Sequence, residues 1–257
     1  MAAVERPFPP GDYDVVVVGS GPGGLQTSYC LRRLGLGHAV LSRDERPGGM
    51  FQRFPIFQRL ITWTKPDAPV ERTAREYEWY DHNSLLADEP ELKALVPALM
   101  DRAFDLPSRA EMEAGIAAFA ERAQIAVRYG CTWESTRQED DRIVLVTSDG
   151  EYRCRAAVFA VGVTEPWRAS VPGLEHAAHY VETERPKRYA GRDVFVVASG
   201  TPASRWPRAS SRGRAASSSA RPGRCRPTRS RSQPCASATC TLTTSTRAAA
   251  PGHMSST

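Results

Sequence analysis

Residues 13–24 read Tyr13-Asp14-Val15-Val16-Val17-Val18-Gly19-Ser20-Gly21-Pro22-Gly23-Gly24. The valine-rich run is typical of a parallel strand that is buried on both faces. The glycine cluster that follows it has the spacing Gly-x-Gly-x-x-Gly. Residues 25–34 then read as a helix closed by Gly35, and residues 38–41 read as a second strand. This order predicts a dinucleotide-binding β-α-β unit at the start of the chain.

Each glycine of this motif has a physical task. Gly19 permits the tight turn, Gly21 lets the backbone approach a pyrophosphate, and Gly24 lets the helix pack closely on the strand. Pro22 and Gly23 lie in the loop just before the expected helix, whose N-terminus would face the phosphates with unpaired N–H groups. We therefore expect these five residues to bind the pyrophosphate of a dinucleotide.

The ribose contact departs from the usual pattern. An acidic residue normally follows the glycines by about 20 residues, at the end of the second strand, where it binds a ribose hydroxyl. This chain has Ser42 at that place. A serine hydroxyl can still bind ribose, helped by Arg43 or Asp44, although less strongly and less selectively than a carboxylate. We expect Ser42 and Arg43 to contact the ribose.

The composition divides the chain into two parts. Its 257 residues and 41% hydrophobic content suit one large domain or two ordinary ones. The formal net charge is +5, yet no Asp, Glu or Lys follows Asp193, while ten Arg lie between Arg205 and Arg247. The rest of the chain carries 24 Lys and Arg against 29 Asp and Glu, so the basic character belongs to the tail.

Cysteines and targeting signals give the expected compartment. The six cysteines form no Cys-x-x-Cys pair and no spacing with histidine that suits zinc or a redox disulfide, so we expect reduced structural thiols and no metal. The proline-rich start lacks the pattern of a signal peptide, and no apolar run reaches the roughly 18 residues of a membrane span. These features favour a cytoplasmic protein without a membrane anchor.

Several further segments resemble the flavin-containing monooxygenase-like families. Residues 46–51, Arg-Pro-Gly-Gly-Met-Phe, resemble their Arg-x-Gly-Gly-x-Trp or Phe segment. Residues 59–65 are similar to the segment that passes the flavin ring, residues 81–86 resemble the related FAD-dependent oxidoreductase-domain proteins, and residues 106–112 also match. The resemblance implies an FAD-binding site that includes Gly49, Met50 and Thr64, the last at a place where the family often has asparagine.

The following residues read as a helix and a small sheet. Ser108 and Glu111 form a capping box before the amphipathic residues 112–122. Strands are expected at residues 125–129, 131–136, 143–147 and 151–155, the last two flanking the turn Asp149-Gly150. Such a meander is typical of the FAD-binding subdomain of the families that this chain resembles. The resemblance places Trp133 beside the adenine, and packing of Trp133 on the meander is the alternative.

Residues 157–162 read as another buried strand that ends at glycine. They resemble the Phe-Ala-Thr-Gly signature at which the family's chain leaves the FAD domain, with Val161 in place of threonine. The resemblance therefore implies that Ala160 and Gly162 contact the cofactor. His176 and His179 fall near the family's linker histidine, and surface positions are the favoured alternative for both.

The sequence changes character after residue 198. Residues 191–197 should open a second dinucleotide-binding unit, but no helix follows them. From Ser199 to Thr257 there is no Val, Ile, Phe or Tyr and a single leucine, Leu242, so neither a strand nor an amphipathic helix is expected. The composition is typical of a disordered Arg/Ser/Pro segment. An arginine-rich tail that binds nucleic acid or another anion is one explanation.

A lost base in the reading frame is the explanation that we favour. Residues 200–207 can be encoded so that reading one base earlier gives Asn-Ala-Gly-Phe-Glu-Val-Ala, followed by an amphipathic helix. That text resembles the family's NADPH-binding turn. The codon of Trp206 is fixed, and one base restored after the codon of Val197 explains the whole change of composition.

The sequence thus predicts an α/β protein in four parts. They are a flexible N-terminus (1–12), a Rossmann-like FAD-binding domain with a small antiparallel β-meander (13–167), a linker with the first strand of a truncated NAD(P)-binding domain (168–198), and a disordered tail that we attribute to a frameshift (199–257). By resemblance, the protein is an FAD-dependent, NAD(P)H-using oxidoreductase, specifically a monooxygenase of a small molecule, with NADPH bound in the intact parent.

Alternatives to this function stay open. A flavin or disulfide reductase is disfavoured by the missing Cys-x-x-Cys pair. A non-enzymatic Rossmann remnant that binds anions through its tail is the other, with nucleic acid the less favoured partner. No catalytic acid or base can be named, and the substrate, the oligomeric state and the activity of the truncated chain are left open.

Overall fold

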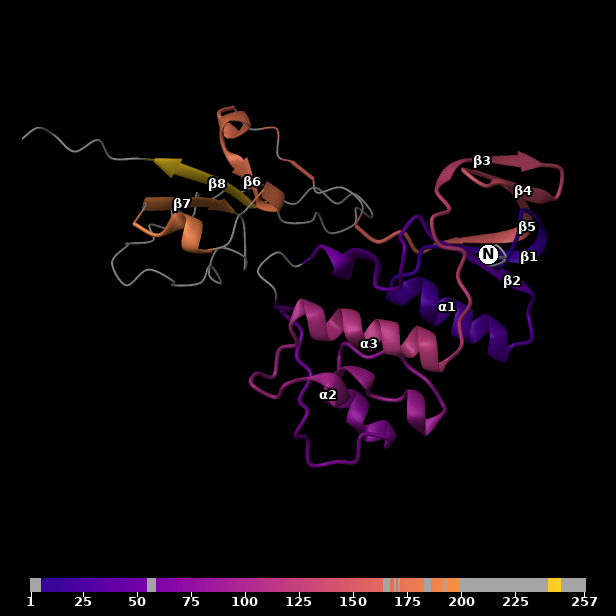
Figure 1. The fold of residues 1–257 in the computed structure, drawn as a ribbon, viewed down its shortest axis with the longest axis horizontal. Helices are drawn as coiled ribbons and strands as arrows, with labels where there is room; N and C mark the ends of the chain where they lie inside the picture. Colours follow the sequence, from indigo (N-terminus) through magenta and orange to yellow (C-terminus); the bar gives the residue numbers. More distant parts are fainter. Residues whose placement is uncertain are drawn as a thin grey trace, which may run out of the picture. The chain divides into compact units, whose positions relative to one another are not determined.

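The computed structural model divides the chain into two compact units, Met1–Thr164 and Glu165–Thr257, and each is described by itself. Figure 1 shows their elements. The structure describes residues 6–54, 59–163, 167–168, 170, 172–182, 186–191, 193–198 and 240–245.

The first unit is built on a five-stranded sheet with the order β2-β1-β5-β4-β3. Strand β1 (Gly11–Val18) pairs in parallel with β2 (His38–Leu41) and with β5 (Gly150–Phe159). Strands β4 (Arg142–Thr147) and β3 (Trp133–Glu139) extend the sheet antiparallel to β5. The meander and the Rossmann strands therefore form one sheet.

Two strand expectations are corrected. The separate strands expected at residues 151–155 and 157–162 are a single strand, β5, because β1 begins at Gly11 and pairs with β5 from Tyr152 onward. Residues 125–129 form no named strand, and only Arg128 bridges to Leu41. The pairing stops there because the chain turns at Gly130, whose φ is +65°.

Helices cover one face of this sheet. Helix α1 (Pro22–Arg33) follows the glycine loop, α2 (Leu95–Leu99) is short, and α3 (Arg109–Arg122) begins at the expected capping box. Alternation along the strands divides the core, because successive side chains point to opposite faces. Val17 and Val40 pack with the helices, whereas Val16 and Leu41 belong to a second cluster with Tyr152.

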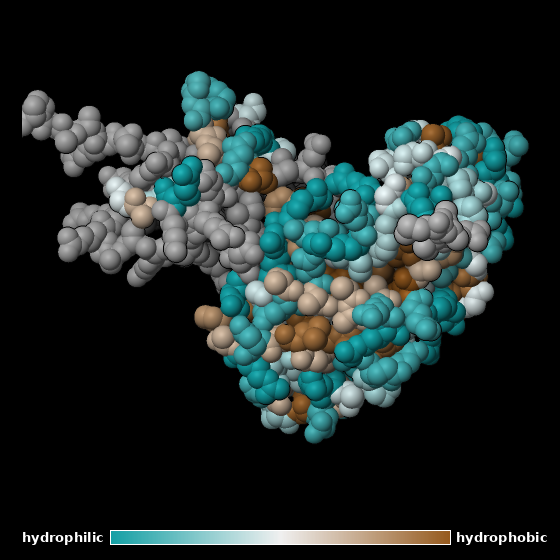
Figure 2. Space-filling view, in the orientation of Figure 1, coloured by the Kyte–Doolittle hydropathy of each residue, from teal (hydrophilic) through white to brown (hydrophobic). Residues whose placement is uncertain are grey.

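Short 3-10 turns connect the helices and strands of the first unit. They are η1 (Gly49–Gln52), η2 (Arg75–Trp79) and η3 (Pro90–Leu92). On the face seen in Figure 2, the first unit is largely hydrophilic, and apolar surface gathers in the region of α2 and α3.

The N-terminal arm differs from the flexible segment that was expected. Residues 1–5 lie outside the described residues. From Arg6 onward the arm is tied to the β4–β5 turn: Arg6 pairs with Asp149 at 3.0 Å, and the Tyr152 hydroxyl donates to the Phe8 carbonyl at 2.8 Å. Arg128 donates to the Pro7 carbonyl at 3.1 Å. These contacts hold the arm in place and lead it into β1.

The second unit contains a three-stranded antiparallel sheet with the order β6-β8-β7. Its strands are β6 (Ala178–His179), β7 (Asp193–Ala198) and β8 (Cys240–Ser245), and its 3-10 turns are η4 (Leu174–His176), η5 (Tyr180–Glu182) and η6 (Pro186–Tyr189). The expected strand near residues 191–197 is present as β7. The expectation of no strand after Ser199 is wrong for β8, whose threonines favour extended backbone. The rest of the predicted disordered tail lies outside the described residues.

Candidate dinucleotide site

The glycine loop is nested between the ends of β1 and β5. A Cβ on Gly19 would overlap the carbonyl oxygen of Ala160, and a Cβ on Gly24 would overlap that of Gly19. Gly19 also has a φ of +118°, which L side chains rarely adopt. Its N–H donates to the Leu41 carbonyl at 2.7 Å. Only glycines at positions 19 and 24 allow this arrangement.

The first turn of α1 is open to an anion. Gly21 is the N-cap residue, no side chain caps the helix, and the first turn contains no acidic residue. The first N–H groups of a helix lack intrahelical partners, and Pro22 has no N–H at all. The N–H groups of Gly23 and Gly24 are therefore left without intrahelical partners at the positive end of the helix dipole.

The Gly48–Met50 segment packs backbone to backbone on this loop. Gly48 donates its N–H to the Ser20 carbonyl at 3.1 Å. Gly49 has a φ of +54°, and a Cβ there would lie 2.8 Å from the Gly21 Cα. The fold thus brings Gly21 and Gly49 together, although they are distant in the sequence, and Met50 follows in η1 with its side chain partly buried.

Ser42 is directed into the protein. It is 2% exposed, and its hydroxyl hydrogen-bonds the Ser20 hydroxyl at 2.8 Å. The Ser42 oxygen also accepts the Asp44 N–H at 3.2 Å, while Arg43 is exposed beside it. The sequence analysis did not single out Ser20, which occupies a variable position of the Gly-x-Gly-x-x-Gly motif. The motif does not indicate which of its residues will hydrogen-bond the chain just after β2.

Trp133 begins β3 and packs against Phe159, the last residue of β5. Its ring is 4.8 Å from that of Phe159, and its indole N–H donates to the Ser135 carbonyl at 2.9 Å. Both side chains are partly exposed, so they form an aromatic pair on the edge of the unit. Gly162 follows with a φ of +61° and open space around it. The sequence analysis did not single out Phe159, because its contact with Trp133 arises only when β3 and β5 come together in the fold.

Thr64 lies in a different environment from the glycine loop. It is 0% exposed, its hydroxyl donates to the Asp81 carboxylate at 2.7 Å, and it accepts the Asn83 amide at 2.9 Å. Its side chain is thus directed to Asp81 and Asn83.

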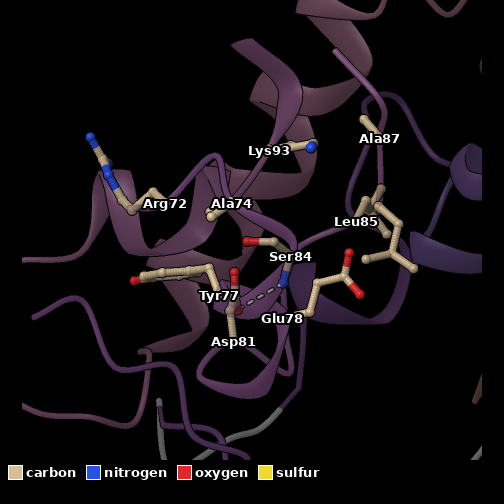
Figure 3. Close-up of a pocket in the computed structure, with 11 residues that line it drawn as sticks. Arg72, Ala74, Tyr77, Glu78, Asp81, Ser84, Leu85, Ala87 and Lys93 are labelled. Carbon is tan, nitrogen blue, oxygen red and sulfur yellow. Dashed lines mark hydrogen bonds between the residues drawn. The ribbon is translucent and has the colours of Figure 1, made fainter. Parts of the chain in front are cut away.

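A small pocket lies beside this network (Figure 3). It has a volume of about 30 Å³, enough for roughly one or two water molecules. Arg72, Lys93, Glu78 and Asp81 are its charged lining residues. No glycine of the loop lines it, so this pocket is not the dinucleotide site.

The three cysteines of the first unit are free thiols. Cys131 and Cys154 are buried, and burial raises the pKa of both thiols. Cys30 is exposed in α1. Among the described residues, no three His, Cys, Asp or Glu side chains gather as a metal site. In the same parts of the chain, no helix has the length and apolar character needed to span a bilayer.

The two histidines of the second unit differ. His176 is exposed, as expected, but His179 is 3% exposed, which corrects the expectation of a surface position. Its backbone N–H donates to Glu182 at 2.8 Å, and its Nδ1 accepts the Val181 N–H at 3.4 Å. These bonds anchor the η5 turn after β6.

Comparison with known proteins agrees with this geometry. A family model described as pyridine nucleotide-disulphide oxidoreductase matches residues 16–203. The chain is 29% identical over 215 residues to FAD-dependent oxidoreductase domain-containing protein 2 of Mus musculus, covering 79% of this chain and 30% of that protein. The protein of the same name from Danio rerio is 26% identical over 199 residues, with 74% and 28% covered.

A solved structure shares the fold. The flavin-containing monooxygenase from Stenotrophomonas maltophilia superposes with a TM-score of 0.55 at 24% identity, covering 71% of this chain and 49% of that chain. This likeness confirms the expected α/β class with a Rossmann-like domain. The chain spans less than a third of the length of the curated relatives and about half of the solved structure.

Proposed function

Because the chain belongs to the pyridine nucleotide-disulphide oxidoreductase family, we propose that it binds FAD on the glycine loop and is the flavin part of an NAD(P)H-using oxidoreductase. The observation that carries the proposal is the uncapped first turn of α1, held against Gly49. The relatives from mouse and zebrafish are named for an FAD-dependent oxidoreductase domain, which supports the choice of FAD over a free nicotinamide cofactor.

The residues present fit the phosphates of FAD. The loop offers N–H groups, the positive end of a 12-residue helix and no acidic side chain, which together favour a pyrophosphate. A Cβ on Gly21 would meet only the Gly49 Cα at 3.6 Å, so its absence leaves room for a ligand rather than relieving a clash. The proposed contacts are Gly19, Gly21, Pro22, Gly23 and Gly24 for pyrophosphate, Arg43 for ribose, and Gly49, Met50, Trp133, Ala160 and Gly162 for the remaining parts of FAD. Ser42 and Thr64 are buried and bonded within the protein, so their proposed role is to hold the neighbouring backbone in place rather than to touch FAD.

The chemistry that FAD would supply at this site is the transfer of electrons from NAD(P)H to oxygen or another acceptor. The residues of the first unit bind and orient the cofactor, and we assign none of them as an acid or base. The strand β7 ends at Ala198, and the residues that would form a nicotinamide-binding loop lie outside the described residues. We therefore assign NADPH binding to the intact parent protein.

Within this class we propose a monooxygenase that acts on a small molecule. A disulfide reductase needs a pair of reactive cysteines, and the sequence has no Cys-x-x-Cys pair. Burial raises the pKa of the Cys131 and Cys154 thiols, which keeps them protonated and unreactive. The segments quoted above resemble monooxygenases, which favours oxygen as the electron acceptor.

The test is FAD binding by the full chain. We expect the purified chain to carry FAD, or to bind added FAD, with the visible absorbance of a bound flavin. Gly21→Val should fold but bind FAD at least about tenfold more weakly, because its side chain fills the approach of the phosphates. Gly37→Ala is the matched control, because its Cβ meets only the flexible Asp14 side chain at 3.4 Å. A folded wild-type chain that binds no FAD would contradict the proposal.

A further inference from the structure

Residues 59–65 are held from both sides by backbone hydrogen bonds. On one side, Thr64 donates its N–H to the Asp105 carbonyl at 2.7 Å, and Leu60 donates to Pro107 at 2.9 Å. On the other side, Lys65 donates to the Tyr80 carbonyl at 2.8 Å. This segment, which resembles the one that passes a flavin ring, is therefore held by backbone hydrogen bonds at residues 60 and 64–65, on either side of an exposed bend at residues 61 and 62.

Asn83 directs its side-chain amide to this segment. Its Nδ2 donates to the Thr64 hydroxyl at 2.9 Å, and it shares its second hydrogen between the carbonyls of Trp63 at 3.2 Å and Thr62 at 3.3 Å. Its Oδ1 accepts the Thr62 hydroxyl at 2.6 Å. Asn83 is 8% exposed, so its own amide group has little access to water. Three successive residues thus depend on one side chain about 20 positions away.

Asp81 completes the network. Its Oδ1 accepts the Thr64 hydroxyl at 2.7 Å and the N–H groups of Asn83 and Ser84 at 3.0 and 3.1 Å, the last drawn in Figure 3. A carboxylate only accepts hydrogen bonds, so Thr64 must donate its hydroxyl hydrogen to Asp81 and accept from Asn83. The Thr64 hydroxyl therefore has no hydrogen left to donate to a ligand.

We infer that Asn83 is a positioning residue, which holds the carbonyls of Thr62 and Trp63 and the Thr64 hydroxyl in place and so determines the surroundings of the flavin ring without touching it. This inference rests on the proposed FAD-binding function. Within the segment, the side chains of Ile61 and Trp63 are exposed, 67% and 47%, and so remain open to a ligand. The centroid of the Trp63 ring lies 4.7 Å from that of His82 in a T-shaped arrangement, and His82 directly precedes Asn83 in the chain. Loss of the Asn83 amide would release this arrangement.

The experiment compares bound FAD in variants of the full chain. Asn83→Leu keeps the shape of the side chain but removes every hydrogen bond. Thr62→Val removes only the hydrogen bond from the Thr62 hydroxyl to Asn83 Oδ1, and we expect it to fold because Thr62 is exposed. The control is Thr147→Val, which removes a buried hydrogen bond of 2.8 Å to Gly150 in the β4–β5 hairpin. The readouts are the visible spectrum and the reduction potential of the flavin, and the amide hydrogen exchange of residues 59–65 without FAD.

We expect Asn83→Leu to shift the spectrum and the potential, with FAD affinity reduced by less than about tenfold, and to accelerate exchange in residues 59–65. Thr62→Val should give smaller changes of the same sign, and Thr147→Val none. Unchanged spectra, potentials and exchange in both test variants would overturn the inference. If Asn83→Leu does not fold, Thr62→Val alone decides. A wild-type chain without FAD would instead show that the proposed function itself has failed, and the inference with it.

Discussion

The carbonyl oxygen of Gly19 occupies the place where a Cβ on Gly24 would lie. We predict that Gly24→Ala destabilises the first unit by about 2 kcal/mol or more, because backbone atoms cannot move aside as side chains do. Gly23→Ala is the matched control, since its Cβ would meet only the Ala160 Cβ at an ordinary 3.6 Å. Urea unfolding should give a clearly higher free energy of unfolding for the wild type and Gly23→Ala than for Gly24→Ala. Equal free energies for all three would contradict the close packing of Gly24 on Gly19.

The arm before β1 should contribute to stability through Tyr152. Its buried ring donates a hydrogen bond to the Phe8 carbonyl at 2.8 Å. We predict that Tyr152→Phe lowers the free energy of unfolding by about 1 kcal/mol, the usual net contribution of such a bond. It should also speed proteolysis after Arg6. A variant with unchanged stability and unchanged cleavage would show that the arm is not held by this contact.

Asp149 should make the first unit sensitive to acid. Burial opposes the charge of Asp149, but hydrogen bonds from Arg128 and Arg6 outweigh it and hold the pKa of this carboxyl below its ordinary value of 3.8. A carboxyl whose pKa is lower in the folded state stabilises the fold above the unfolded pKa, and this contribution disappears as the pH falls through the folded pKa. The loss therefore falls below about pH 4.

We predict that Asp149→Asn is less stable than the wild type at neutral pH by about 2 kcal/mol, because the charge-assisted bonds from Arg128 and Arg6 are weakened. The difference should shrink as the pH is lowered from about 5 to about 2. Urea unfolding across this range measures it. A difference that stays constant with pH would mean that Asp149 is not the titrating group.

The reading frame can be tested on the gene. We predict that one base restored after the codon of Val197 opens a frame that reads Gly-Lys-Arg, then Asn-Ala-Gly-Phe-Glu-Val-Ala, and continues into further strands and helices. The family match ends at residue 203, a few residues past this point, which supports the prediction. Nucleotide sequencing across the codons of residues 195–207 decides it. Codons that allow no such frame would make the arginine-rich tail genuine.

We also predict a difference in activity between the present chain and the protein encoded by the restored reading frame. The restored protein should oxidise NADPH with the bound flavin, whereas the present chain should bind FAD with little or no NADPH-driven turnover. Equal turnover by the two proteins, measured as NADPH oxidation, would contradict the placement of the NADPH site after residue 198.

Sequence patterns that span only a few residues were sufficient to predict much of the secondary structure of the first unit. The glycine spacing of Gly19 to Gly24, the Ser108 capping box and the Asp149-Gly150 turn each act over one turn of chain, and the structure contains the helix or hairpin that each predicts. The continuous strand β5 was not predicted, because its length depends on where β1 begins, more than a hundred residues earlier.

The sequence by itself determined that a strand, a glycine loop and a helix would form a dinucleotide-binding unit, because steric freedom and helix polarity are local properties of these residues. Only the tertiary structure decided which groups meet at this unit. The Ser42 hydroxyl bonds the Ser20 hydroxyl inside the protein, the backbone of Gly49 packs on that of Gly21, and the Asn83 amide donates to the Thr64 hydroxyl. These contacts link residues about 20 or more positions apart, and hydrogen-bonding groups at such distances find their partners only after the core has packed.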